Sequence, residues 1–135
     1  MLNKFSSLKS RAKKRQLKLT ITFDQFKALK NGDCFYCGVS NNLLRFYAEA
    51  MKIKTPWMTL DRKDNAVGYL PENVVGACFL CNKIKGSFFS AEEMLIIGRL
   101  LVAPKLKEFE DQVWDTFMDW CKYAAPESDF EDNVP

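Results

Sequence analysis

The sequence predicts a small α+β domain with an additional helix at each end. Three observations support this fold class: two C-x-x-C pairs far apart in the chain, two short apolar runs of strand length, and helix-capping residues ahead of helical patterns. A chain of 135 residues is expected to form one compact unit. Its 47% apolar and 27% charged residues exclude a wholly disordered protein.

The N-terminal segment, residues 1–20, is predicted to form a basic helical arm. A helix over NKFSSLKSRAKKRQLKL places Phe5, Leu8 and Ala12 on one side and basic side chains around the rest. The segment contains seven basic residues and no acidic one, a pattern typical of proteins that bind a phosphate backbone. A solvated helix face is the alternative. The residues expected to contact DNA are Lys13, Lys14 and Arg15.

The central segment, residues 21–103, is predicted to be the main domain. Thr22 is a helix N-cap, and the helix after it is expected to end at Asn31-Gly32. A short helix over 43–53 follows and ends at Pro56.

Two strands and two further helices complete this domain. Residues 57–62 and 72–78 are predicted to be strands, and residues 79–86 begin a helix. Ser90 then opens another helix with the capping box S-A-E-E, and we expect Pro104 to interrupt that helix.

The C-terminal end is acidic. Residues 104–125 predict a helix, and residues 126–135 predict a disordered acidic tail. Nine acidic residues and one basic residue, Lys122, lie between positions 108 and 135. The helix therefore suits a basic protein partner or the protein's own cationic surface, and a helix that only packs on its own domain is the alternative.

The two C-x-x-C pairs predict one structural zinc ion. Each pair presents two thiolates from a tight turn, and four thiolates complete a closed tetrahedral site. Two disulfides or four buried apolar thiols are the alternatives. The first is disfavoured because no secretory signal precedes the cysteines, and the second because the spacing is paired. The four ligands are Cys34, Cys37, Cys78 and Cys81.

The segment between the two pairs supplies a longer motif. The chain carries C-x-x-C-G, then LDRKDNAVGY followed by N-V, then C-x-x-C-N-x-x-K-G. With this pattern it resembles the HNH branch of the ββα-metal endonucleases, in particular phage-type members with two zinc knuckles. The resemblance covers about residues 8 to 97 and implies a zinc-bound ββα-metal (HNH) core.

The resemblance implies roles for residues around this motif. Asp61 and Asn82 would bind a catalytic Mg²⁺ or Mn²⁺ through oxygen, and Asn73 would hold the loop between the strands. An alternative is that Asp61 and Asn82 merely cap a turn and a helix. On the helix predicted to begin at residues 79–86, Lys83 and Lys85 are expected to bind DNA.

This sequence departs from the family pattern where the first histidine, a general base, is expected. Arg62 occupies that position, and the chain contains no histidine. Arginine is too basic to accept a proton from water at neutral pH, so Arg62 would clamp the scissile phosphate. Tyr69 is the first candidate for the base, because a neighbouring cation favours a phenolate. Alternatively, the metal orients a water without a dedicated base, and Tyr69 is an ordinary loop aromatic.

The sequence therefore predicts a metal-dependent DNA endonuclease or nickase. The alternatives are a catalytically inactive DNA-binding module of the same fold and an interaction or inhibitor protein that uses its acidic helix. No apolar run approaches the roughly 20 residues that span a bilayer, and no secretory signal is present. We thus expect no membrane partner and a cytoplasmic location in a bacterium or a phage-infected cell.

Overall fold

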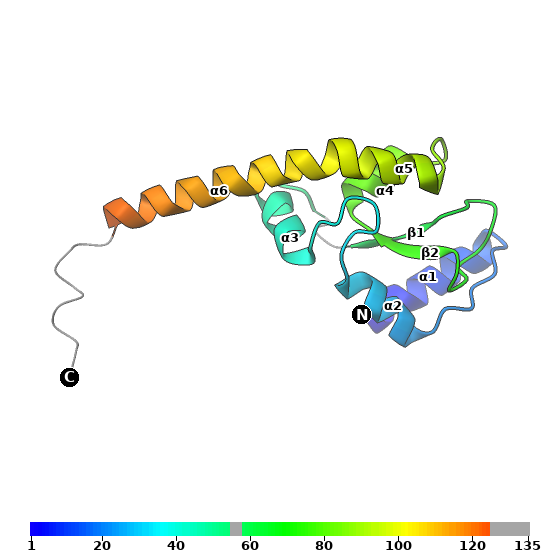
Figure 1. Ribbon diagram of the computed structural model, residues 1–135. Coiled ribbons are helices and arrows are strands. Elements are labelled where there is room, and N and C mark those ends of the chain that lie inside the picture. Colours follow the sequence, from blue (N-terminus) through cyan, green and yellow to red (C-terminus); the bar gives the residue numbers. More distant parts are fainter. Residues whose placement is uncertain (55–57, 125–135) are drawn as a thin grey trace.

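The computed structural model describes residues 1–54 and 58–124 and shows an α+β fold built around a two-stranded sheet (Figure 1). The sheet lies between the two N-terminal helices on one side and the helices that follow it in the chain on the other (Figure 1). In chain order the elements are α1 (Leu2–Lys14), α2 (Phe23–Asn31), α3 (Asn41–Ala50), β1 (Thr59–Arg62), β2 (Val74–Ala77), α4 (Phe79–Lys85), α5 (Ala91–Ile97), the π-helix η1 (Gly98–Val102) and α6 (Ala103–Ala124).

The two strands pair antiparallel, with Thr59 opposite Ala77 and Arg62 opposite Val74. Successive side chains of a strand point to opposite faces, so β1 divides its residues between the two sides of the sheet. Leu60 packs with the apolar residues of α1 and α2. Thr59 and Asp61 instead contact side chains of α4. Both strands are shorter than predicted, and Trp57 lies outside the described residues.

Two apolar clusters flank the sheet. The first joins α1 and α2 to Tyr69 and Val74, and the apolar side of α1 is the one predicted from the sequence, with Phe5, Leu8 and Ala12 buried. The second surrounds the four paired cysteines and extends to α5 and α6. The sheet is thus clamped between an N-terminal layer and a cysteine-centred layer.

Local signals explain where the early helices begin and end. Thr22 accepts a hydrogen bond from Gln25 N–H, and the Gln25 side chain accepts one from Thr22 N–H, so α2 begins with a complete capping box. Ser40 caps α3, which therefore starts earlier than the predicted helix over 43–53. The predicted end of that helix at Pro56 lies outside the described residues.

The prediction that Pro104 interrupts the long C-terminal helix was wrong. Elements α5, η1 and α6 follow one another without a break from Ala91 to Ala124. Proline has no N–H to donate, and its ring crowds the preceding turn of an α-helix. The structure accommodates it by a wider turn just before it, in which Ala103 N–H donates to Gly98 O. Pro104 therefore lies within a continuous helix. The acidic tail predicted over residues 126–135 lies outside the described residues.

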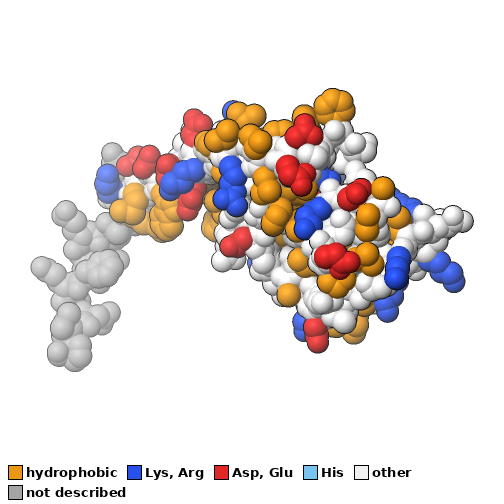
Figure 2. Space-filling view, turned by 45° about the vertical axis from the view of Figure 1, so that its right-hand side comes forward, with side chains coloured by type: hydrophobic (Ala, Val, Ile, Leu, Met, Phe, Trp, Pro, Cys, Tyr) orange, Lys and Arg blue, Asp and Glu red, His pale blue; other side chains and the backbone are white. Residues whose placement is uncertain are grey.

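The resulting helix α6 projects from the domain and carries both charge signs along its surface (Figure 2). Lys107 pairs with Asp111 at 2.9 Å and with Glu110 at 3.8 Å, so part of the acidic charge is neutralised within the helix. Trp114 and Met118 are exposed on the same helix. In the described residues no helix is both long enough and apolar enough to cross a membrane.

Gly98 shows how closely the long helix packs on the first cysteine pair. Its backbone is helical, with φ −60° and ψ −44°, so conformation alone does not require glycine. A Cβ at this position would lie 2.6 Å from the Tyr36 carbonyl carbon and oxygen. The helix and the first cysteine turn are therefore in backbone contact at Gly98.

We expect Gly98→Ala to lower the free energy of unfolding by about 1–3 kcal/mol, the usual cost of overpacking, although alanine favours helices. Chemical denaturation followed by circular dichroism measures this change. Gln112→Ala on the exposed surface of α6 is the control and should change the free energy by less than about 0.5 kcal/mol. An equal or higher stability of Gly98→Ala would contradict the close packing.

Candidate active site and metal centre

The four cysteines of the two C-x-x-C pairs lie at one point. Their sulfur atoms all lie within 4.8 Å of one another, and all four side chains are buried. Cys37 Sγ and Cys78 Sγ are 3.7 Å apart. A tetrahedral ion with metal–sulfur bonds of about 2.3 Å requires S···S distances of about 3.8 Å. The thiols therefore form a site that fits a four-coordinate metal ion.

Local backbone structure builds each half of this site. In the first half, Gly38 has a φ of 78° and its N–H donates to Cys34 O, which closes the turn. In the second half, Cys78 is the N-cap of α4, and its sulfur accepts a hydrogen bond from Cys81 N–H at 3.4 Å. Each pair thus holds its sulfurs in a fixed orientation.

The charges of the thiols are strongly coupled. Hydrogen bonds from the other thiols, that from Cys37 first, lower the pKa of Cys34, whereas hydrogen bonding to the Cys34 sulfur raises the pKa of Cys81. Without a cation, adjacent negative charges of this kind repel one another in a buried site. A divalent ion would remove that repulsion and allow all four sulfurs to ionise.

Asp61 of β1 is buried beside this centre. One of its oxygens, Oδ2, accepts a hydrogen bond from the Tyr36 hydroxyl at 2.5 Å. Lys85 Nζ of α4 lies 3.4 Å from the same oxygen and 3.5 Å from Oδ1. Burial raises the pKa of Asp61, and the hydrogen bond from Tyr36 and the charge of Lys85 oppose that rise. Burial and the bond to Asp61 likewise raise the pKa of Tyr36, so its hydroxyl stays a donor.

The structure corrects the expectation for Lys85. Its side chain is only 1% exposed, and its ammonium donates to Arg62 O at 3.0 Å besides pairing with Asp61. A buried ammonium held by the Asp61 carboxylate and the Arg62 carbonyl oxygen does not face a DNA phosphate. Lys85 lies one helical turn after Asn82 on α4, but its ammonium contacts Asp61 and Arg62 O of β1. Lys83 is exposed on α4.

Asn82 and Asn73 have different surroundings. The Asn82 amide nitrogen donates to Thr59 Oγ1 at 2.8 Å, which leaves the amide oxygen as an acceptor. Asn73 is buried, and its amide nitrogen donates to Asp64 O, Val67 O and Gly68 O. Its amide oxygen accepts from Asp64 N–H at 3.0 Å. Asn73 thus fixes the loop between the strands.

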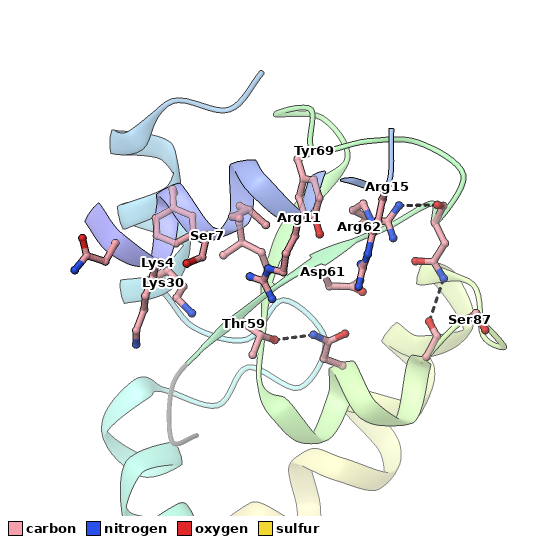
Figure 3. A pocket seen from close by; sticks show the side chains of 17 residues that line it. Lys4, Ser7, Arg11, Arg15, Lys30, Thr59, Asp61, Arg62, Tyr69 and Ser87 are labelled. Carbon is pink, nitrogen blue, oxygen red and sulfur yellow. Dashed lines mark hydrogen bonds between the residues drawn. The ribbon is translucent and has the colours of Figure 1, made fainter. Parts of the chain in front are cut away.

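That loop brings Arg62 and Tyr69 together. The Arg62 guanidinium carbon lies 5.4 Å from the centre of the Tyr69 ring. Arg62 Nη1 donates to Asn65 O at 2.7 Å and to Val67 O at 3.4 Å, so the loop holds the guanidinium over the ring. The Tyr69 side chain points from its loop into the adjacent pocket (Figure 3).

This pocket has a volume of about 1000 Å³ and lies between α1, β1 and the start of the turn after α4. Asp61, Arg62, Tyr69 and Asn82 line it, and Asn73 and Lys85 do not. Asp61 is the one carboxylate among its lining residues, all of which belong to the described part of the chain (Figure 3). The basic residues that line it are Lys4, Arg11, Arg15, Lys30 and Arg62.

Arg15 was predicted to contact DNA, whereas the sequence analysis missed three of the other cations, namely Lys4, Arg11 and Lys30. Lys4, Arg11 and Arg15 are separated by seven and four residues, which places them on one face of α1 and its end. Lys4 and Arg11 lie outside the dense basic run of residues 13–15 that was predicted to contact DNA. Lys13 and Lys14 are exposed and lie outside the pocket lining. Lys30 could not be found this way, since only the fold brings α2 to β1.

A comparison with solved structures agrees with this fold. The solved structure of the rare-cutting HNH restriction endonuclease PacI, described as exhibiting an extraordinary mechanism of DNA perturbation, matches with a TM-score of 0.64. The two chains are 30% identical over 75% of each. The chain belongs to the HNH endonuclease family.

A second relative of this HNH protein is the "Uncharacterized protein R423" of Acanthamoeba polyphaga mimivirus. It is 28% identical over 112 residues, which are 83% of this chain but 18% of that protein. The chain thus spans less than a fifth of the length of this relative. No family model matches the chain. Membership of the HNH family supports a nuclease or nucleic-acid-binding function.

We expect the purified HNH protein to contain one zinc ion per chain. Cys81→Ser should lose that ion and unfold or severely loosen the domain, because metal binding and folding are linked in so small a core. Elemental analysis and thermal unfolding measure the two effects. Cys121→Ser is the matched control, since Cys121 lies on α6 outside the cluster, and it should retain metal and stability. Metal-free wild-type protein with full stability would contradict this prediction.

Proposed function

We propose that the protein is a metal-dependent DNA endonuclease or nickase that hydrolyses phosphodiester bonds. The observation that carries the proposal is the pocket in which Asp61 and Asn82 lie among five basic side chains. Five cations around one pocket suit a polyanion, and the oxygen atoms of Asp61 and Asn82 are the ligand type that suits a hard divalent ion. The basic surroundings thus bind the backbone, and the oxygens mark the point of reaction.

The residues present fit a catalytic Mg²⁺ or Mn²⁺. Lys85 and Tyr36 approach Asp61 from outside the pocket, so its pocket side stays accessible to an ion. The Asn82 amide is oriented by Thr59, which leaves the oxygen to bind. When bound, the ion would stabilise negative charge on the phosphate and activate a water molecule. Zinc at the four cysteines would be structural, because a site with four protein ligands has no open position.

The protein's own residues supply the remaining steps. Arg62 uses Nη1 to bind the loop, so its other guanidinium nitrogens are available to hold a phosphate. In hydrolysis, the oxygen of water attacks phosphorus, the bond to the leaving oxygen breaks, and the proton of water passes to a base. Tyr69 is the candidate for that base, because it lies in contact with Arg62 and points into the pocket. Asn73 acts as a positioning residue for their loop.

We expect Asp61→Ala to abolish Mg²⁺- or Mn²⁺-dependent nicking of plasmid DNA, because it removes a ligand of the catalytic ion. Zinc content, measured in the same preparation, should not change. If wild-type protein that contains zinc binds DNA but cuts neither single-stranded nor double-stranded DNA with either metal, the enzyme proposal fails. The inactive DNA-binding module would then replace it.

Replacement of Tyr69 by Phe distinguishes the two sources of the base. If the phenol accepts the proton, the single-turnover cleavage rate should fall by about 10² or more at unchanged DNA affinity, as is usual for a general base. The Phe side chain preserves the ring beneath Arg62. A loss of less than about tenfold would instead assign the reaction to a metal-oriented water without a dedicated base.

Neutralising the pocket face of α1 should weaken DNA binding without changing sequence preference, since phosphate contacts carry no base identity. We expect the double variant Arg11→Ala, Arg15→Ala to make the salt dependence of log K shallower by about one unit per lost contact. The double variant Lys13→Ala, Lys14→Ala removes the same charge from outside the pocket lining. Equal effects of the two pairs in titrations over a range of salt concentrations would contradict the pocket as the DNA-binding surface.

A further inference from the structure

The two oxygens of Asp61 have different surroundings. Oδ2 accepts the Tyr36 hydroxyl at 2.5 Å and lies 3.4 Å from Lys85 Nζ. Among the described residues, the contact recorded for Oδ1 is the longer one of 3.5 Å with Lys85. A carboxylate oxygen that accepts a short hydrogen bond has less capacity to bind a cation. Oδ1 is therefore the oxygen left to bind a metal ion.

Tyr36 is held more rigidly than an ordinary hydrogen-bond donor. It lies between Cys34 and Cys37, and none of its surface is exposed. Its carbonyl accepts a hydrogen bond from Arg99 Nε at 3.2 Å, and its backbone packs against Gly98. The position of its hydroxyl is thus set by the cysteine turn on one side and by the long helix on the other.

Tyr36 also lies behind Asp61 as seen from the pocket. Asp61 lines the pocket and Tyr36 does not. The hydroxyl therefore cannot contact DNA in this arrangement, but it fixes the rotation of the carboxylate that can. A free aspartate would need to lose that rotational freedom when it binds an ion.

We propose that Tyr36 is a positioning residue that turns Asp61 Oδ1 toward the pocket and so connects the four-cysteine centre to the binding of the catalytic ion. This inference rests on the proposed function, because it assigns the ion to Asp61. Tyr36, which lies between the two cysteines of the first pair, would thus orient a ligand of the catalytic ion as well as form part of the metal-binding turn. Partners that orient a metal ligand commonly change metal affinity or activity by about 10–100-fold when they are removed.

The test is Tyr36→Phe in the full-length protein loaded with zinc. The Phe ring fills the same space, and the substitution removes only the donor to Oδ2. Binding of Mn²⁺ is measured by electron paramagnetic resonance, and zinc content by elemental analysis. We expect Mn²⁺ affinity to fall by about tenfold or more with one zinc ion retained. Cleavage should need correspondingly more Mn²⁺, with unchanged DNA affinity.

Tyr47→Phe is the matched control. Tyr47 packs on the rings of Phe79 and Phe109 and does not line the pocket, so loss of its hydroxyl should leave Mn²⁺ affinity unchanged. A purely structural hydroxyl at Tyr36 would lower the melting temperature and leave Mn²⁺ affinity at the wild-type value, and that result would overturn the inference. Loss of zinc from Tyr36→Phe would overturn it too, since the effect would then not be confined to Asp61.

The same measurements separate this inference from the proposed function. If wild-type protein does not cleave DNA, but Asp61→Ala and Tyr36→Phe both weaken Mn²⁺ binding, the enzyme proposal fails and the positioning role stands. If Asp61→Ala leaves Mn²⁺ binding unchanged, Asp61 is not the ligand and the role of Tyr36 is overturned.

Discussion

The meeting of the two cysteine pairs is the constraint on which the other features of the structure depend. It joins a turn after α2 to the start of α4, although Cys37 and Cys78 are 41 positions apart. Because Cys78 is also the N-cap of α4, the same contact sets where that helix begins. Asn82 and Lys85 then follow on successive turns, and both reach β1. A metal ion at this point would therefore organise the active site as well as the core.

The buried pair of Asp61 and Lys85 is difficult to explain by stability alone. Removing two charges from water usually costs about as much as their attraction returns, and apolar pairs are often at least as stable. This pair has the additional hydrogen bonds that such a site requires, from Tyr36 to Asp61 and from Lys85 to Arg62 O. A carboxylate that is buried, hydrogen-bonded and still open on one side to a cationic pocket is more consistent with a functional site.

Local signals in the sequence predicted much of the fold. The capping boxes at Thr22 and Ser90 and the paired cysteines specify their structures within a few residues, because the interacting groups are neighbours in the chain. The direction of Lys85, the donor from Tyr36 and the position of Lys30 in the pocket depend on packing between distant elements. Pro104 was misread for a related reason, since a helix can widen by one π turn to accommodate proline and no local pattern shows that it will.

Because this HNH chain contains no histidine, the base in the proposed hydrolysis must come from another group. A histidine side chain changes its charge near physiological pH and can therefore act as a base there. No side chain in this sequence has such a pKa unless its surroundings shift it. In the proposed mechanism Arg62 and Tyr69 would divide the task, because the loop fixed by Asn73 holds the guanidinium against the ring. In the proposed reaction the same guanidinium would also hold the phosphate that water attacks. Under this proposal, the contact between Arg62 and Tyr69 gives a structural reason why arginine, rather than a neutral residue, stands at this position.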